Sequence, residues 1–309
     1  MQQQAQATSS CTDSPRRPGV IGAAVEASLR ALARVTPTGR GSYRLVRLAR
    51  QAIPRDAWSG VFRAPGNLQM RLDLAEFPDC CMAYGLFERE TERVINRLLR
   101  PGDHFVDGGA NIGYFTLRAA KRVGASGRVD AFEPQPDNSA RLIENLERNG
   151  LREQVNVHQV ALSNAAGEAM IHFFTAGPNI GFYNHGCSSL FAEPGYETRA
   201  APVRTVRMDE ILAGTRPRLV KLDVQGAEPL VIEGMTGLLD RDPPAIIMEW
   251  EPRAAHHAGL DPFDMIRRLL DAVPAYELYL IGVRWRRIEP TEAALAQLRW
   301  GNLLFLPAQ

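Results

Sequence analysis

The chain has 309 residues, of which 45% are hydrophobic and 23% charged, so it can hold one large globular domain with a sizeable core. No apolar run approaches the roughly 18 residues of a membrane span. The net charge of +1 is uneven: residues 1–55 carry nine arginines against two acids, which leaves 27 basic against 33 acidic residues elsewhere. An acidic main domain is a poor match for a phosphate backbone, so no nucleic-acid partner is expected.

The four cysteines, Cys11, Cys80, Cys81 and Cys187, show no CxxC spacing. Free thiols in a reducing cytoplasm are the simplest interpretation, and a cytoplasmic protein is therefore expected. Arginines precede an apolar stretch near the N-terminus, but Glu26 interrupts that stretch too soon for an export signal.

Residues 1–19 are rich in Gln, Ser, Thr and Pro, which predicts a disordered tail. Residues 20–57 predict a basic helical extension, because apolar residues recur there at helical spacing and arginines line a second helix. The arginines form either a solvated face or, through residues 20–55, a peripheral contact with an anionic membrane surface or an acidic partner. The sequence leaves the oligomeric state open.

Residues 58–309 predict one α/β domain. Short strands are expected at 61–62, 68–74 and 81–86, and Phe87, Thr91, Val94 and Leu98 then mark one face of a helix. Strands and helices alternate from there, which predicts a doubly wound, mostly parallel seven-stranded sheet. The strands are expected at 105–106, 129–132, 155–160, 219–224, 245–250, 276–281 and 303–306. The helices are expected at 136–149, 229–239 and 262–272, with a β insertion over about 164–217.

A glycine-rich turn, from Asp107 to Gly113, follows the first strand of this alternation. Glycines there let the backbone approach a cofactor closely, and Glu133 ends the next strand, where an acid can hold two ribose hydroxyls. A carboxylate at Asp107 would repel a pyrophosphate but suits a cofactor that brings an ammonium and a sulfonium. The turn therefore predicts S-adenosylmethionine.

Five segments together resemble the FkbM-type methyltransferases: 107–116, 131–134, 161–164, 188–190 and 220–228. The resemblance covers roughly residues 82–252. It implies a class I S-adenosylmethionine-dependent methyltransferase fold, acting on a hydroxyl of a small molecule, sugar or secondary metabolite. Gly108 replaces the usual valine, and Gln225 replaces the usual glutamate, which removes a carboxylate near the active-site strand.

The turn residues are expected to hold the methionine end of the cofactor, Glu133 its ribose and Leu162 the edge of its adenine. Glu88 resembles part of an upstream element that closes over the amino acid, and a helix cap is the alternative. The expected cofactor-binding residues are Glu88, Asp107, Gly109, Asn111, Gly113, Glu133, Leu162 and Asp223.

Asp223 ends the fourth strand, at the sheet edge where ligands bind, and can approach the sulfonium or orient the nucleophile. His185 is the preferred general base because its loop is expected to insert next to the site. Glu249 is a second catalytic candidate, since it breaks an otherwise apolar strand and burying an acid is costly. Asp223 with Glu249 or Glu251 would suit Mg²⁺, but no fixed-spacing ligand set is present and no metal is expected.

Three rival functions remain open. An NAD-dependent dehydrogenase would need a dinucleotide fingerprint that the turn fits only in part. An N-methyltransferase or nucleic-acid methyltransferase has a signature echoed at residues 242–244, but the echo lies before the fifth strand and lacks the aromatic residue. A cofactor-binding scaffold protein is disfavoured by the intact acids at 107, 133 and 223. The sequence favours an enzyme with a small-molecule or glycan acceptor.

Overall fold

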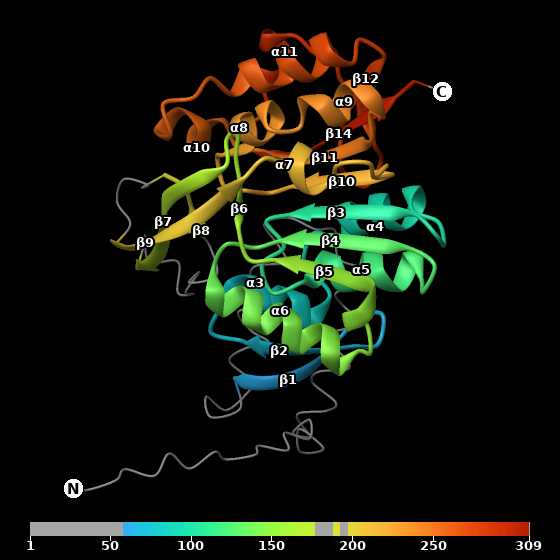
Figure 1. Ribbon diagram of the computed structural model, residues 1–309, viewed down its shortest axis with the longest axis vertical. Coiled ribbons are helices and arrows are strands. Elements are labelled where there is room, and N and C mark those ends of the chain that lie inside the picture. The colour runs from blue at the N-terminus through green and yellow to red at the C-terminus, as the bar shows by residue number, and fades with distance from the viewer. Residues whose placement is uncertain (1–57, 177–187, 192–196, 309) are drawn as a thin grey trace, which may run out of the picture.

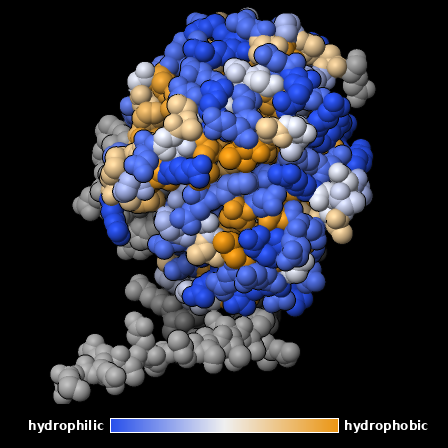
Figure 2. Space-filling model, viewed as in Figure 1, coloured by the Kyte–Doolittle hydropathy of each residue, from blue (hydrophilic) through white to orange (hydrophobic). Residues whose placement is uncertain are grey.

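The computed structural model describes residues 58–176, 188–191 and 197–308 (Figure 1). The expected tail and basic helical extension lie outside the described residues, as do His185, Cys11 and Cys187. Within the described ranges, no helix has the length and apolar character needed to cross a membrane. Figure 2 shows a largely hydrophilic face with hydrophobic residues gathered in small groups.

The central sheet has eight strands in the order β5-β4-β3-β10-β11-β14-β12-β13. The first five are parallel, and β14 pairs antiparallel with both β11 and β12. The bounds are β3 (His104–Gly108), β4 (Arg128–Phe132), β5 (Val155–His158), β10 (Leu219–Leu222), β11 (Ala245–Trp250), β12 (Tyr276–Leu280), β13 (Arg286–Arg287) and β14 (Gly301–Pro307). The predicted doubly wound, mostly parallel class I methyltransferase sheet is confirmed, with the two-residue β13 as an additional eighth strand.

The chain reverses its direction of travel across the sheet at β3. It passes from β3 through β4 to β5 on one side, and then returns to place β10 on the other side of β3. Such a switch point opens a crevice at the carboxyl ends of the two strands, where open α/β sheets bind ligands. The loops after β3 and β10 therefore face each other across this crevice.

Helices cover both faces of the sheet, and neighbouring strand residues point to opposite layers. Leu219 packs with α3 (Phe77–Tyr84), α4 (Arg89–Leu98), α5 (Tyr114–Val123) and α6 (Pro136–Arg148). Val220 packs with α7 (Met208–Ile211), α8 (Glu228–Glu233), α9 (Thr236–Arg241), α11 (Pro262–Ala272) and α12 (Glu292–Ala296). The short α10 (Pro252–His257) contacts α11. This alternation explains the nearly continuous apolar runs of the parallel strands.

A hairpin of β1 (Ser59–Ala64) and β2 (Leu68–Asp73) packs against α3 and α6. The strand predicted at 81–86 is wrong, because those residues belong mainly to α3, which begins near Pro78 and ends at Gly85 in the left-handed conformation. The helix is buried nearly all round, so its apolar run has no readable period. The helix predicted at 229–239 is divided into α8 and α9 near Gly234, where a Cβ would collide with the carbonyl oxygen of Ser163.

The predicted β insertion forms a second sheet of four strands in the order β6-β9-β7-β8. Its strands are β6 (Ala161–Leu162), β7 (Gly167–Ala176), β8 (Ser188–Ser189) and β9 (Glu197–Val206). Ser189 Oγ donates a hydrogen bond to the carbonyl oxygen of Gln225, 2.7 Å away, in the loop after β10. Residues of this sheet, among them Leu162, Ile171 and Ser188, line the cavity at the crevice.

Candidate active site

The turn after β3 depends on two glycines. Gly109 has φ +79°, and a Cβ there would collide with the carbonyl oxygen of Asp223. Gly113 has φ +91° and begins α5, and a Cβ there would collide with the side chain of Leu142. Glycine at 109 therefore lets the backbone pass close to the residue after β10, and glycine at 113 lets it pass close to α6.

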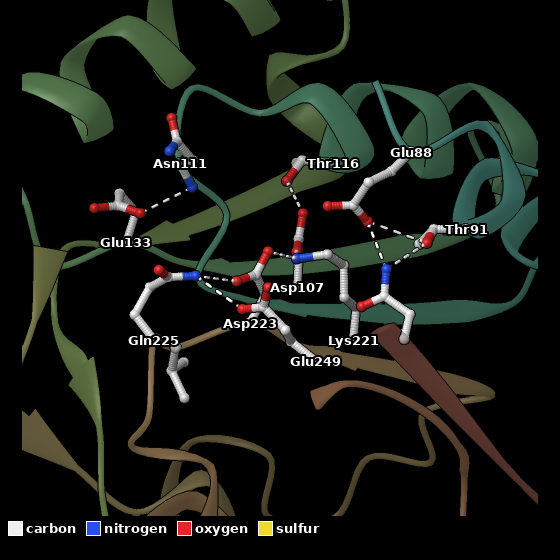
Figure 3. Close-up of polar contacts among 12 residues, drawn as sticks. Glu88, Thr91, Asp107, Asn111, Thr116, Glu133, Lys221, Asp223, Gln225 and Glu249 are labelled. Carbon is white, nitrogen blue, oxygen red and sulfur yellow. Dashed lines mark hydrogen bonds and ion pairs between the residues drawn. The ribbon is translucent and has the colours of Figure 1, made fainter. Parts of the chain in front are cut away.

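Asp107 is fully buried at the end of β3 and does not line the cavity. Thr116 Oγ1 donates a hydrogen bond to Asp107 Oδ2 at 2.6 Å, and Lys221 Nζ lies 3.6 Å from Asp107 Oδ1 (Figure 3). Burial raises the pKa of Asp107, and the nearby Lys221 opposes this rise without cancelling it. In this arrangement Asp107 fixes the base of the turn and balances the charge of Lys221.

Glu133 follows β4 and lines the cavity. The Asn111 N–H donates to Glu133 Oε2 at 2.8 Å, and the Gln135 N–H donates to Oε1 at 2.9 Å. Burial raises the pKa of Glu133 to about 7, although these two N–H donors lower it. The side chain of Asn138 also hydrogen-bonds to Glu133. A carboxylate has about four acceptor positions, so Glu133 retains capacity for a further donor such as a hydroxyl.

A polar cluster joins the ends of β10 and β11 (Figure 3). Lys221 Nζ lies 3.1 Å from Asp223 Oδ2. The amide nitrogen of Gln225 donates to Asp223 Oδ1 at 2.8 Å and to Glu249 Oε2 at 2.9 Å. Trp300 Nε1 donates to Glu249 Oε1 at 2.9 Å. Gln225 therefore holds the two carboxylates side by side in one cavity.

The two carboxylates of this cluster have opposite protonation tendencies. Burial raises the pKa of Asp223, but Lys221 and hydrogen bonds with Glu249 and Gln225 outweigh burial and hold it below its ordinary value. Burial and the charge of Asp223 raise the pKa of Glu249 well above its ordinary value. Asp223 is thus the more readily ionised member of the pair, and Glu249 is the member that more readily holds a proton.

Lys221 is almost fully buried, with 3% of its surface exposed. Burial lowers its pKa, but the surrounding carboxylates of Asp223, Asp107 and Glu88 outweigh burial and keep the pKa above its ordinary value. Lys221 is therefore a permanent cation and not a proton acceptor.

Glu88 is the residue that precedes α4, with φ +35°, and its side chain makes no hydrogen bond that caps the helix. It also lines the cavity. Its Oε2 accepts hydrogen bonds from Thr91 Oγ1 at 3.1 Å and from Asn302 Nδ2 at 2.9 Å. Burial and the charge of Asp223 raise the pKa of Glu88 to about 7.

One cavity of about 240 Å³ brings most of the predicted residues together. Its walls include Glu88, Gly109, Asn111, Glu133, Leu162, Asp223 and Glu249. Gly113 lies behind the turn with Asp107, and His185 lies outside the described residues. Sequence reasoning assigned no role to Lys221 or Trp300. Lys221 stands two residues before Asp223, and residues two apart on a strand share a face, so the sequence could have placed Lys221 beside Asp223. No local pattern places Trp300 beside Glu249.

Lys221, Gln225 and Trp300 supply nitrogen donors to the two carboxylates. In the part of the chain that the structure describes, no group of three or more His, Cys, Asp or Glu side chains is arranged to hold a metal ion. Gln225 stands where the resemblance would place a third carboxylate, and its amide donates to Asp223 and Glu249.

Comparisons with known proteins give consistent results. The Methyltransferase FkbM domain family matches residues 107–276. The hexuronic acid methyltransferase AglP of Haloferax volcanii is 28% identical over 194 residues, which cover 62% of this chain and 71% of that protein. Among solved structures, a methyltransferase FkbM from Methylobacillus flagellatus is 17% identical, with a TM-score of 0.43 and coverage of 69% of this chain and 50% of that chain.

The O-methyltransferase TomG from Streptomyces achromogenes, solved in complex with S-adenosylmethionine, is 13% identical, with a TM-score of 0.39 and coverage of 71% and 80%. The present chain thus spans about half the length of the Methylobacillus chain and a larger share of the other two. The family match covers more than half of the 309 residues. The protein therefore belongs to the FkbM methyltransferase domain family and is an S-adenosylmethionine-dependent methyltransferase.

Proposed function

We propose that this enzyme methylates a hydroxyl group of a small molecule, with sugars as the preferred acceptor class. The observation that carries the proposal is the pair of carboxylates, Asp223 and Glu249, in the same cavity as the glycine turn. Their environments shift the two pKa values in opposite directions, lowering that of Asp223 and raising that of Glu249, which is the pattern that separates the acid and base members of a carboxylate pair.

The residues present fit the cofactor. Gly109 and Asn111 would meet its methionine end, Glu133 its ribose hydroxyls and Leu162 its adenine, with Glu88 near the amino group. Among the described residues, the cavity wall carries four acids, Glu88, Glu133, Asp223 and Glu249, and one cation, Lys221. A cationic ligand would favour the ionised forms of these acids, whereas a pyrophosphate would disfavour them, which argues against the dinucleotide alternative.

When bound, S-adenosylmethionine would supply an activated methyl group, whose carbon bonds to an acceptor oxygen in line as its bond to the sulfonium sulfur breaks and the sulfur leaves as a neutral thioether. The protein's own task is to hold the acceptor hydroxyl in that line and to take its proton. Asp223 is the group that we assign to this proton, because Lys221 and Gln225 keep its carboxylate ionised. Glu249 and Lys221 act as positioning residues that set the charge of Asp223. His185 stays a predicted base that the described residues do not include.

The proposed acceptor class has support of a different kind. The relative from Haloferax volcanii is named as a hexuronic acid methyltransferase. The cavity also offers polar groups to a hydroxyl-rich ligand, since Ser188 and Glu249 lie in its wall. Amine acceptors and nucleic acids stay as alternatives for an acceptor screen.

Asp223→Asn tests the proposal, because asparagine keeps the shape of the side chain and removes its charge. We expect turnover of labelled methyl groups to fall about 10²–10⁴-fold, which is the usual contribution of a general base. Calorimetry should show a far smaller change in the affinity for S-adenosylmethionine. His185→Ala is the matched comparison, since a strong loss of turnover there with an active Asp223→Asn variant would move the base to His185. Failure of the wild-type protein to bind S-adenosylmethionine would overturn the proposal as a whole.

A further inference from the structure

Trp300 is the most unusual side chain at the edge of the candidate site. It has 58% of its surface exposed, yet its Nε1 donates a hydrogen bond to Glu249 Oε1 at 2.9 Å. Glu249 lines the cavity. One edge of the indole is therefore attached to the proposed reaction centre, while much of the ring surface faces solvent.

The backbone holds Trp300 in this place. Gly301 and Asn302, the first residues of β14, pair with Trp250 and Glu249 of β11. Asn302 also donates a hydrogen bond to Glu88, a second acid of the cavity wall, at 2.9 Å. The start of β14 thus bonds to two cavity carboxylates, and its register fixes the indole beside Glu249.

An exposed tryptophan is not in itself a site, because single apolar residues are common on protein surfaces. Here the polar edge of the indole is already bonded, so the solvent-facing surface that remains is apolar. A ligand that covers this surface must present an apolar face. A ligand that also reaches Asp223 and Glu249 must carry hydroxyl groups at the edge of that face.

A pyranose ring has this combination, because its C–H groups form apolar patches and its hydroxyls project around the ring. We propose that Trp300 is the platform on which the acceptor sugar stacks, and that it thereby determines the preference for pyranose rings. This inference rests on the proposed function, since it places the acceptor next to the carboxylate pair. Trp300 is accordingly a specificity-determining residue and takes no part in proton transfer.

Two substitutions separate stacking from the hydrogen bond. Trp300→Phe keeps an aromatic face and removes the N–H donor, whereas Trp300→Leu removes the aromatic face as well. Trp285→Leu is the matched control, because Trp285 is another partly exposed tryptophan, which stacks with Arg97. Neither tryptophan is part of the cavity wall itself, and of the two it is Trp300 that bonds to a residue of that wall, Glu249. The probes are methyl glycosides of glucuronic acid, glucose and mannose, with a catechol as a planar aromatic acceptor. KM and kcat are measured from labelled methyl transfer, and direct binding from ligand-observed NMR.

We expect Trp300→Leu to raise KM for a pyranoside about tenfold or more, as truncation of an aromatic contact residue usually does. Trp300→Phe should stay within about threefold of wild type, Trp285→Leu should not change KM, and the affinity for S-adenosylmethionine should be the same in all variants. An equal rise in KM in Trp300→Phe and Trp300→Leu, or no rise in either variant, would overturn the stacking proposal.

Two further outcomes separate this inference from the proposed function. Binding of S-adenosylmethionine without binding or methylation of any pyranoside would overturn the sugar platform and the preference for sugar acceptors, but not methylation of another hydroxyl. If Trp300→Leu raised KM more for catechol than for the pyranosides, the sugar platform would also be overturned, and the preference would be for planar acceptors. Failure to bind S-adenosylmethionine would count against the proposed function itself.

Discussion

Replacing Glu133 with glutamine tests whether the cavity contains a buried carboxylate that is poised to bind hydroxyls. Only 4% of the Glu133 surface is exposed, and burial raises its pKa from the ordinary 4.5 to about 7. The native state therefore binds a proton between these two pH values that the unfolded state does not. By linkage, the contribution of Glu133 to stability is highest below pH 4.5 and falls as the pH rises through 7.

The size of this fall follows from the pKa. A rise from 4.5 to about 7 corresponds to about 3 kcal/mol of penalty for the ionised form, of which roughly 2–3 kcal/mol develops between pH 5 and pH 8. Glutamine does not titrate, so Glu133→Gln removes the pH-dependent part. It also removes one acceptor from the pair that receives the Asn111 and Gln135 N–H groups, which costs about 1–3 kcal/mol at every pH.

The informative quantity is therefore the pH dependence of the difference between the two proteins. We measure the free energy of unfolding of both proteins by urea denaturation at pH 5, 6, 7 and 8. The value for Glu133→Gln minus the value for wild type should increase by roughly 2–3 kcal/mol from pH 5 to pH 8. A difference that is constant with pH would show that Glu133 titrates at its ordinary pKa, and would refute the reasoning. In calorimetry, the affinity of wild type for S-adenosylmethionine should increase as the pH rises through about 7, and that of Glu133→Gln should be weaker and lack this step.

Three further substitutions test separate parts of the structure. Gly109→Ala should prevent close approach of the turn to Asp223, so we expect a loss of at least about 1–3 kcal/mol in urea denaturation and weaker cofactor binding in calorimetry. Asp130→Asn removes a buried partner of two histidines and an arginine and should destabilise the protein by about 3–5 kcal/mol at pH 7; the same loss at pH 3 would contradict an ionised Asp130. Gln225→Glu places a third carboxylate against Asp223 and Glu249, so turnover should fall and its pH optimum should rise; an unchanged pH profile would argue against the role of the amide.

The basis of the Asp130 prediction is a charge network on the sheet. Asp130 on β4 accepts hydrogen bonds from His104 and His158 at 2.8 Å each and from Arg128 at 2.7 Å. Burial raises the pKa of Asp130, but these three partners outweigh burial and hold the pKa well below its ordinary value. The stabilisation is therefore present above the ordinary pKa of an aspartate and is lost as the pH falls towards the native value.

The sequence predicts those parts of the fold and site that depend on local residue patterns. The alternation of apolar strands with amphipathic helices gives the parallel sheet, and the glycines at 109 and 113 mark a turn that only glycine can form. Glu133 and Asp223 are recognisable because a strand end in such a sheet lies at the crevice. The two acids lie in one cavity because β4 and β10, which they follow, are the two neighbours of β3 in the sheet.

The parts that the sequence does not predict depend on distant contacts or on full burial. The helix α3 carries no period because nearly every residue in it is buried, so it is indistinguishable from a strand by pattern. The contact between Trp300 and Glu249 joins residues 51 positions apart, and exists because β14 inserts between β11 and β12. No spacing rule within the chain encodes that insertion.

The division of roles between Asp223 and Glu249 shows why residue type alone cannot assign a catalytic base. Both are acids at the ends of neighbouring parallel strands, and either qualifies from the sequence. The difference comes from Lys221, which lies 3.1 Å from Asp223 and has no such contact with Glu249 among the described ion pairs. One buried ammonium stabilises the nearer carboxylate as an anion, and that anion in turn disfavours ionisation of the other. The assignment of Asp223 as the base therefore depends on Lys221, and removal of the ammonium should weaken the distinction between the two acids.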